Sequence, residues 1–228
     1  MRPLTDRTPK PLLEVRGRPL IEWHLRSLAA GGFRRLAVNV DWLGEQIVDR
    51  YGAQPVLPGI DGPLSIAYSD EGLDFGGALE TAGGIARALP LLDEVFWVLA
   101  GDIYAPQFGF TERTLERFAA SDKLAHLWLV PNPPQHPLGD FGLSGKKLAL
   151  RSDAVQFTFS TIALYRREFF AALPFGNPDG HKAPLAPMLR TAMDNQQVSA
   201  ELYRGPWADV GTPERLAQLN HSQEQRTP

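Results

Sequence analysis

Val95-Phe96-Trp97-Val98-Leu99-Ala100-Gly101-Asp102 is the most strand-like stretch of this chain. It begins with six apolar residues and ends in a glycine and an aspartate. A run that is apolar on both faces is typical of a strand buried inside a parallel sheet. An aspartate that directly follows such a strand lies at the carboxyl edge of the sheet, where the ligands of open α/β folds bind. The stretch therefore predicts an α/β fold with Asp102 at its ligand-binding edge.

The residues before this strand alternate between helical and extended patterns. Apolar side chains at helical spacing predict helices at residues 19–30, 43–51 and 80–89. Short apolar runs predict strands at residues 36–40 and 64–68, the first of them a buried parallel strand. This alternation predicts a Rossmann-like, mixed, mainly parallel sheet with helices on both faces.

The second half of the chain is less regular, but no linker separates it from the first. Its patterns predict strands at residues 124–130, 155–165 and 199–203 and a hairpin at 141–150. They also predict helices at residues 185–195 and 213–221 and a polar, frayed end at 222–228. We therefore expect one domain over residues 1–228.

Composition narrows the class of protein. A chain of 228 residues, 43% of them hydrophobic, can bury a core without covalent staples. It has no cysteine, which excludes disulfides and thiolate metal sites. The formal charge of −3, without a basic cluster, argues against a nucleic-acid partner. Neither a membrane-spanning run nor a signal-peptide pattern is present, so the expected location is the cytoplasm and no membrane partner is expected.

Two aspartates and a lysine form a candidate phosphate-handling set. Asp102 and Asp209, which precedes the helix-start pair Thr212-Pro213, are candidate ligands for Mg²⁺ because this ion takes carboxylate and phosphate oxygens. Asp102 could instead cap the next turn. Lys10 stands between two prolines in Thr8-Pro9-Lys10-Pro11-Leu12, so its ammonium is placed on a stiff turn. Its alternative is a solvated surface lysine.

Other segments have polar or flexible residues where a ligand could approach. Leu79-Glu80-Thr81-Ala82-Gly83-Gly84-Ile85 opens a predicted helix with small residues, which suits either an anion near the backbone amides or close packing against another segment. Asp140, in a Gly-rich loop, and Thr158, on a predicted strand, could present hydrogen-bonding groups to a sugar, although a turn and a half-buried strand explain them equally.

The order of these motifs resembles the sugar-1-phosphate nucleotidyltransferase family. Met1-Arg2-Pro3-Leu4-Thr5 with Pro-Lys-Pro, the Gly-rich helix start, Gly-Asp after a strand, and Trp-Ala-Asp-Val-Gly-Thr follow in the family's sequence, from Met1 to about Thr212. Within the family the chain looks most like the N-acetylmuramate-α-1-phosphate uridylyltransferases. The resemblance implies the nucleotide-diphospho-sugar transferase fold, with a nucleotide-binding half at about residues 1–105 and a sugar-binding half at about 106–228.

The resemblance also implies a reaction and a set of roles. A sugar-1-phosphate, with N-acetylmuramate-1-phosphate favoured, would condense with UTP in the presence of Mg²⁺ to give a UDP-sugar and pyrophosphate in cell-wall recycling. The implied roles are catalysis by Lys10 and Arg2, Mg²⁺ binding by Asp102 and Asp209, nucleotide binding by Thr81, Gly83 and Gly101, and sugar-phosphate binding by Glu80, Asp140, Thr158 and Lys182.

Two departures from the family pattern leave alternatives open. The family's first strand and Gly-rich loop would precede Met1, so we expect that the start is an internal methionine and that the chain as written has weak or no activity. The stretch 72–77 looks expanded beside the base-binding loop. The alternatives are therefore a mannose-1-phosphate guanylyltransferase, a glucose-1-phosphate nucleotidyltransferase and a non-catalytic nucleotide-sugar-binding module. The Pro-Lys-Pro turn argues against a metal-dependent glycosyltransferase. A monomer or small homo-oligomer is expected.

Overall fold

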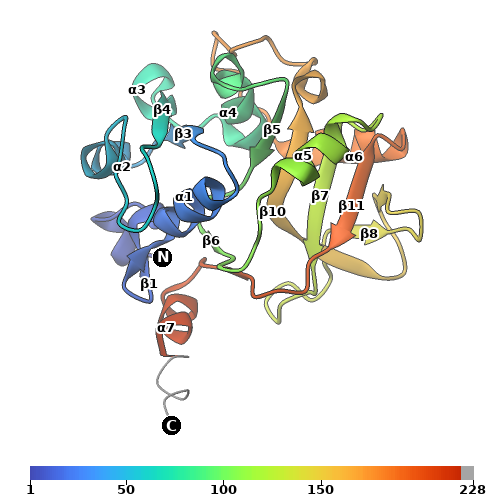
Figure 1. The fold of residues 1–228 in the computed structure, drawn as a ribbon. Coiled ribbons are helices and arrows are strands. Elements are labelled where there is room, and N and C mark those ends of the chain that lie inside the picture. Colours follow the sequence, from blue (N-terminus) through green and yellow to red (C-terminus); the bar gives the residue numbers. More distant parts are fainter. Residues whose placement is uncertain (222–228) are drawn as a thin grey trace.

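A six-stranded mixed sheet lies at the centre of the computed structural model, which describes residues 1–221 (Figure 1). Its strands run in the order β11-β7-β10-β8-β9, and β5 pairs with the far end of β10. The expected frayed end at residues 222–228 lies outside the described residues. The bounds of the six strands are β5 (Val95–Val98), β7 (Ala125–Val130), β8 (Phe141–Leu143), β9 (Ala149–Leu150), β10 (Gln156–Arg166) and β11 (Val198–Leu202).

The long strand β10 organises this sheet. It pairs antiparallel with β5, β7 and β8 along different parts of its length, and its register with β7 shifts between Phe159 and Ala163. All six residues of β7 are buried, because β10 and β11 cover its edges and apolar side chains pack on both faces. The predicted α/β class and mixed sheet are confirmed, although β11–β7 is the one parallel pair within this sheet.

A separate parallel pair forms the other half of the molecule. β3 (Arg35–Val40) and β4 (Ser65–Asp70) pair in register from Arg35–Ser65 to Val40–Asp70. Within residues 1–221 this pair has no ladder to the six-stranded sheet. The predicted parallel strand at residues 36–40 therefore exists, but the prediction that it is buried was wrong, since Val40 alone in β3 is buried. Leu36, Ala37 and Val38 are half-buried.

Seven helices surround the strands within the described residues, at α1 (Leu20–Ala30), α2 (Gly44–Tyr51), α3 (Glu71–Phe75), α4 (Glu80–Ala88), α5 (Glu112–Ala119), α6 (Leu185–Asp194) and α7 (Pro213–His221). One apolar cluster joins α1 and α2 to β3 and β4, through side chains such as Ile21, Ile47 and Ile66. A larger cluster lies between α4, α6 and the six-stranded sheet. The helices therefore pack against separate apolar clusters on the two groups of strands.

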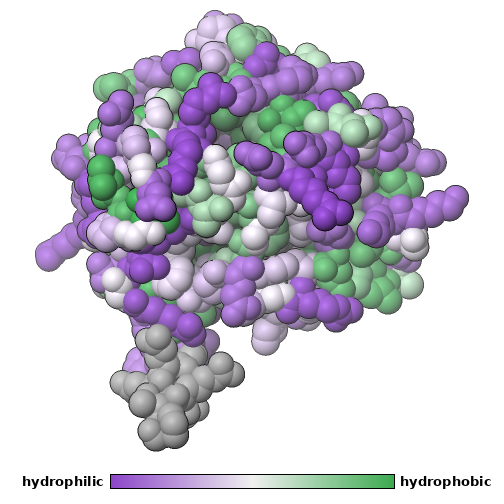
Figure 2. All heavy atoms as spheres, in the orientation of Figure 1, coloured by the Kyte–Doolittle hydropathy of each residue, from purple (hydrophilic) through white to green (hydrophobic). Residues whose placement is uncertain are grey.

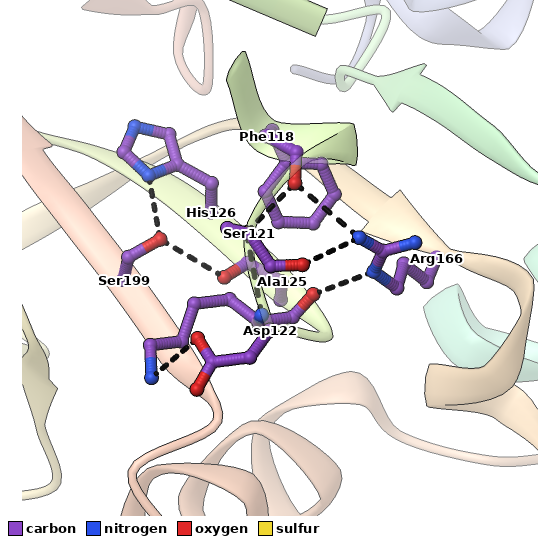
Figure 3. Close-up of polar contacts among 8 residues, drawn as sticks. Phe118, Ser121, Asp122, Ala125, His126, Arg166 and Ser199 are labelled. Atoms are coloured by element: carbon purple, nitrogen blue, oxygen red, sulfur yellow. Dashed lines mark hydrogen bonds and ion pairs between the residues drawn. The ribbon is translucent and has the colours of Figure 1, made fainter. Parts of the chain in front are cut away.

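Helix α5 was not predicted from the sequence, and local polar groups explain why it forms. The Thr111 hydroxyl accepts a hydrogen bond from the Thr114 amide at its start, which is the usual N-cap arrangement. At its end, Arg166 of β10 donates to the Ala119 carbonyl at 2.6 Å and to the Ser121 carbonyl at 2.7 Å. Figure 3 shows the contact of Arg166 with Ser121. This last contact comes from a strand far along the chain, so sequence periodicity does not reveal it.

Short elements complete the fold around the chain ends. β1 (Glu14–Val15) and β2 (Arg18–Pro19) form a hairpin, and β6 (Ile103–Tyr104) pairs with β12 (Ala208–Asp209). Four 3₁₀ helices occur among residues 1–221, at Leu4–Asp6, Lys10–Leu12, Leu89–Leu91 and Arg167–Phe170. No described helix is long and apolar enough to cross a membrane. On the face shown in Figure 2, apolar residues reach the surface at several separate places among polar ones.

Candidate active site

Asp102 and Asp209 lie side by side although they are far apart in the chain. β6 pairs antiparallel with β12 so that Asp209 is opposite Ile103, and the Val210 amide donates to the Asp102 carbonyl at 2.8 Å. The Asp102 and Asp209 side chains are 37% and 36% exposed, so both are accessible to a ligand. The tertiary structure thus brings together the two carboxylates that the sequence singled out, and their role as metal ligands stays a prediction.

Lys10 completes a charged set with Asp102. Pro9 is extended and Pro11 lies in the first turn of a 3₁₀ helix, and this turn places the Lys10 Nζ atom 3.3 Å from Asp102 Oδ2. A Cβ atom on Gly101 would lie 3.1 Å from Pro11 Cγ, so a glycine lets the proline turn pack directly on the end of β5. The pair is half-exposed and contributes at most about 1 kcal/mol, so Lys10 can exchange Asp102 for a phosphate at low cost.

Asp209 has partners that sequence reasoning missed. Its Oδ2 atom forms an ion pair with Arg215, in the first turn of α7, and its Oδ1 atom accepts from Gln135 Nε2 at 2.8 Å. The predicted helix start at Thr212-Pro213 could have indicated the contact with Arg215, because it places this arginine in the first turn of the helix that follows Asp209. Gln135 comes from a distant Pro-rich loop and had no signal in the sequence. These contacts hold the Asp209 carboxylate in one orientation.

The donor set fits a Mg²⁺ ion that is shared with phosphates. Within residues 1–221 no group of three or more His, Cys, Asp or Glu side chains is arranged to hold a metal. The protein offers two accessible carboxylates, from Asp102, which directly precedes β6, and from Asp209, on the neighbouring strand β12. Mg²⁺ usually takes one or two carboxylates and completes its shell with water and substrate phosphates. The arrangement therefore suits an ion that arrives with a nucleotide.

Arg2 lies beside the same site, in a cavity of about 420 Å³ that Lys10, Asp41 and Trp42 also line. Its side chain is 88% exposed and pairs with Asp6 at 3.2 Å between Nε and Oδ1. An exposed ion pair of this kind holds the arginine only weakly. Arg2 is therefore free to turn towards an anion in this cavity, and its catalytic role stays a prediction.

The glycines at the start of α4 are explained by protein packing. A Cβ atom on Gly83 would lie 2.6 Å from the His181 carbonyl oxygen. The amides of Ala82 and Gly83 donate to the Ala183 carbonyl at 3.0 and 3.2 Å. These amides are therefore not free for a phosphate, and the packing alternative accounts for this part of the motif. Thr81 is exposed at the same helix start, and its contact with a nucleotide stays a prediction.

Glu71 and Glu80 lie at or just before the start of α4, and Glu71 holds the backbone there. Glu80 is exposed and has a φ of +60°, an uncommon left-handed conformation for this residue type. The buried Glu71 accepts hydrogen bonds from the Leu79 amide at 2.7 Å and from Asn39 Nδ2 at 3.0 Å. Burial raises the pKa of Glu71. Glu71 therefore fixes the backbone that precedes Glu80 and Thr81, a role that sequence reasoning did not assign.

Lys182 is carried to the start of α4 by the loop that packs on Gly83. The fully buried Asn177 holds this loop, because its side-chain amide donates to the Gly83 carbonyl at 3.1 Å and to the His181 carbonyl at 2.9 Å. Lys182 itself is exposed. The structure thus places Lys182 on a loop next to Thr81, although the two are distant in the chain, and its binding of a sugar phosphate stays a prediction.

Asp140 and Thr158 both bond to protein groups. Asp140 accepts from the Phe159 amide at 2.8 Å, and its Oδ1 atom lies 3.1 Å from His136 Nε2. Thr158 is 6% exposed and donates to Asn132 Oδ1 at 3.0 Å. These bonds fasten the loop that carries the Asp209 partner, Gln135. Their direct contact with a sugar stays a prediction, while their structural role is established by these bonds.

A comparison with protein families identifies the family to which the chain belongs. The model of the nucleotidyl transferase family matches residues 1–146, the part of the chain that includes Lys10, Thr81 and Asp102. The chain belongs to the nucleotidyl transferase family. It is an enzyme, and the resemblance to the sugar-1-phosphate nucleotidyltransferases seen in its motifs is confirmed.

Two characterised relatives and one solved structure extend this match. The chain is 44% identical to N-acetylmuramate alpha-1-phosphate uridylyltransferase of Neisseria meningitidis serogroup B, over 95% of this chain and 90% of the relative. It is 30% identical to the protein of that name from Caulobacter vibrioides, over 94% and 88%. A Bacillus anthracis structure with bound sucrose, described as a candidate glucose-1-phosphate thymidylyltransferase, covers 100% of this chain and 92% of its own with a TM-score of 0.78. At 16% identity, that likeness shows the fold alone.

Proposed function

We propose that this nucleotidyltransferase condenses N-acetylmuramate-1-phosphate with UTP to give the UDP-sugar and pyrophosphate. The observation that carries the proposal is the meeting of Lys10, Asp102 and Asp209 at one edge of the fold. The 44% identity to a uridylyltransferase of that specificity, over 95% of the chain, supports the choice of sugar and base. We further propose that residues 1–105 bind mainly the nucleotide and residues 106–228 mainly the sugar, within one domain.

The reaction makes and breaks one phosphorus–oxygen bond each. A phosphate oxygen of the sugar-1-phosphate attacks the α-phosphorus of UTP, and the bond to the bridging oxygen of the β-phosphate breaks, so that pyrophosphate leaves with the bonding electrons. Lys10 exchanges its half-exposed partner Asp102 for a phosphate oxygen and neutralises charge as it develops. Asp102 and Asp209 would hold Mg²⁺, which would supply further charge neutralisation on the triphosphate. The protein positions the two anions in line, which is most of the catalytic task.

The polar contacts around Asp209 keep its carboxylate oriented towards the shared edge. Arg215 and Gln135 each engage one of its oxygen atoms. Each oxygen retains a lone pair that these partners do not use, so the carboxylate can still bind a cation. We further propose that the reaction takes place in the cytoplasm, in the recycling of cell-wall sugars.

The assay that tests this function measures pyrophosphate release. The protein is incubated with Mg²⁺, UTP and each of three substrates: N-acetylmuramate-1-phosphate, glucose-1-phosphate and mannose-1-phosphate. GTP replaces UTP in a parallel series. Release with N-acetylmuramate-1-phosphate and UTP is the expected result. Release only with another sugar or with GTP overturns the specificity, and nucleotide binding without pyrophosphate release identifies a non-catalytic module.

A further inference from the structure

Each of the two candidate metal ligands is already paired with a cation. Lys10 Nζ lies 3.3 Å from Asp102 Oδ2, and Arg215 forms an ion pair with Asp209 through Nη1 and Oδ2. The two positive charges balance the two negative ones, whereas two carboxylates without such partners would repel a phosphate. When a nucleotide brings Mg²⁺ to the carboxylates, both cations therefore become available to its phosphates.

The Arg215 guanidinium has hydrogen-bonding capacity that the protein does not use. Its Nη1 atom donates to Asp209 Oδ2 and, at 3.5 Å, to the Asp209 carbonyl. Within residues 1–221 its Nε and Nη2 atoms make no hydrogen bond, and the side chain is 25% exposed. A guanidinium presents its N–H donors in a planar fork that matches the oxygens of carboxylates and phosphates. Arg215 can therefore engage a second anion at this site.

Gly211 makes it possible for Arg215 to reach back to Asp209. A Cβ atom on Gly211 would lie 2.8 Å from Arg215 Nη2 and 3.0 Å from Asp209 Oδ2. A side chain at this position would therefore displace the guanidinium from the carboxylate. The Arg215 amide also donates to Thr212 Oγ1 at 3.3 Å, at the start of α7. The short segment between the two charges thus holds them together until a ligand competes for one of them.

The backbone of α7 is anchored at the far end of the helix. Asn220 Oδ1 accepts from the Arg16 amide at 2.6 Å, and Asn220 Nδ2 donates to the Glu14 carbonyl at 3.2 Å. Arg16 Nε donates to the Leu219 carbonyl at 3.4 Å. These bonds fasten α7 to the β1–β2 hairpin. The side chain of Arg215 can therefore change its partner by rotation about its own bonds, while the helix that carries it stays in place.

The N-terminal segment brings further positive charge to this side of the molecule. Leu216, which follows Arg215, and Met1 pack against the same apolar cluster. Arg2 and Lys10 line the cavity of about 420 Å³ described above. Arg2, Lys10 and Arg215 therefore lie around the two carboxylates, although they come from different segments. Several cations at one site suit a polyphosphate, which carries charge on each of its phosphate groups, better than a single phosphate.

We propose that Arg215 is a further catalytic residue of this enzyme, which binds a phosphate oxygen of the nucleoside triphosphate. Its guanidinium exchanges Asp209 for that oxygen when the carboxylate takes up the Mg²⁺ that accompanies the nucleotide, and no covalent bond forms or breaks in this exchange. Gln135, which donates to the other carboxylate oxygen, keeps Asp209 in place as Arg215 leaves. The inference rests on the proposed function, because it takes the nucleotide as the ligand.

Equilibrium binding, measured by isothermal titration calorimetry, tests this exchange without turnover. In EDTA, metal-free UTP is titrated into the unmodified protein, into Asp209→Asn, and into Asp209→Asn combined with Arg215→Gln. The asparagine releases the arginine, so Asp209→Asn is expected to bind UTP roughly tenfold more tightly than the unmodified protein. The variant that also carries Arg215→Gln is expected to lose this gain. Asp209→Asn combined with Arg113→Gln, at an exposed position of α5, is the matched control and is expected to keep it.

Titrations with Mg²⁺ present identify the phosphate that Arg215 binds. Arg215→Gln is expected to weaken the binding of UTP and of inorganic pyrophosphate roughly tenfold and to leave the affinity for N-acetylmuramate-1-phosphate unchanged. Arg215→Lys is expected to recover part of the affinity, because it keeps the charge but loses the planar fork. It also replaces Arg215→Gln in every comparison if circular dichroism shows that the glutamine variant does not fold.

The outcomes separate this inference from the proposed function. A gain in UTP affinity that persists without Arg215 in the Asp209→Asn background overturns the inference, as does a loss of affinity for the sugar phosphate alone, because Arg215 then only holds Asp209 or serves the other substrate. A protein that binds UTP through Arg215 but releases no pyrophosphate with any sugar contradicts the proposed function and still supports the inference.

Discussion

At the scale of single residues, the candidate site is organised around the carboxylates of Asp102 and Asp209. Asp102 directly precedes β6 and Asp209 lies on β12, its partner strand, and each carboxylate is paired with a cation, Lys10 or Arg215. Both were predicted from sequence because each stands at a recognisable boundary of an element. Arg215 and Gln135 were not predicted as partners, because their contacts depend on where a helix and a loop meet Asp209 in space.

Replacing either aspartate by asparagine is expected to remove turnover and keep the fold. Asp102→Asn and Asp209→Asn preserve the shape but lose the charge that attracts Mg²⁺, and each should lower kcat roughly a thousandfold. Pyrophosphate release by each variant and by the unmodified enzyme is measured, and circular dichroism verifies folding. Asp122→Asn is the matched control, because this exposed carboxylate lies in a remote turn beside Lys123 (Figure 3). Full activity in either site variant would remove that aspartate from the metal site.

Lys10→Ala tests the proline-braced turn separately from the metal site. Loss of the ammonium removes charge neutralisation at the phosphates and should lower kcat about a hundredfold, while the exposed pair with Asp102 contributes little to stability. Steady-state kinetics at saturating Mg²⁺, with Lys146→Ala as an exposed control lysine, measures the effect. A rate close to that of the unmodified enzyme would mean that the turn is structural only.

At the scale of elements, the start of α4 shows how a motif can be identified correctly and explained only in three dimensions. The sequence predicted a helix with small residues at its beginning, and the helix is there. Its glycines serve a neighbouring loop, since the His181 and Ala183 carbonyls occupy the space and the amides beside Gly83. From sequence alone, ligand and loop were equal alternatives, because both need a missing side chain.

Gly83→Ala is expected to destabilise this junction. The new Cβ atom would lie 2.6 Å from the His181 carbonyl oxygen, so the loop must move, at a cost of about 1–3 kcal/mol. Urea unfolding monitored by tryptophan fluorescence measures this change in the free energy of unfolding. Gly109→Ala is the control, because its Cβ would meet no atom within 4 Å. Equal stability of the two variants would show that the loop does not pack on α4 in solution.

At the scale of the whole molecule, buried histidines make stability depend on pH. Burial lowers the pKa of His126 to about 4, with the nearby Glu201 opposing the shift. His126 lies on β7 and contacts Ser199 of β11 at 2.8 Å from Nδ1 to Oγ (Figure 3). Burial also lowers the pKa of His24 to about 4. In the unfolded chain both histidines titrate near their ordinary pKa of about 6.5, so acid favours the unfolded state.

The expected result is a loss of stability as the pH falls from about 6.5 towards 4. The stabilisation is fully present above the unfolded pKa, and each histidine accounts for up to about 3 kcal/mol of the loss. Urea unfolding at pH 7 and pH 4.5 measures it. His126→Asn, which keeps a polar group near Ser199, should reduce the pH dependence, whereas His221→Gln at an exposed site should not. An unchanged pH dependence in His126→Asn would show that this histidine titrates normally.

The sequence by itself determined the α/β class, the positions of most helices and strands, and the three charged residues of the candidate site. It did so because apolar periodicity and boundary residues such as Pro9, Pro11 and the Gly101-Asp102 pair are local properties. Only the tertiary structure decided that Asp102 meets Asp209, that Gly83 makes room for a loop, and that β3 and β5 face each other across a cavity. These depend on which distant segments pack together, and the residue pattern of one segment does not state what lies beside it.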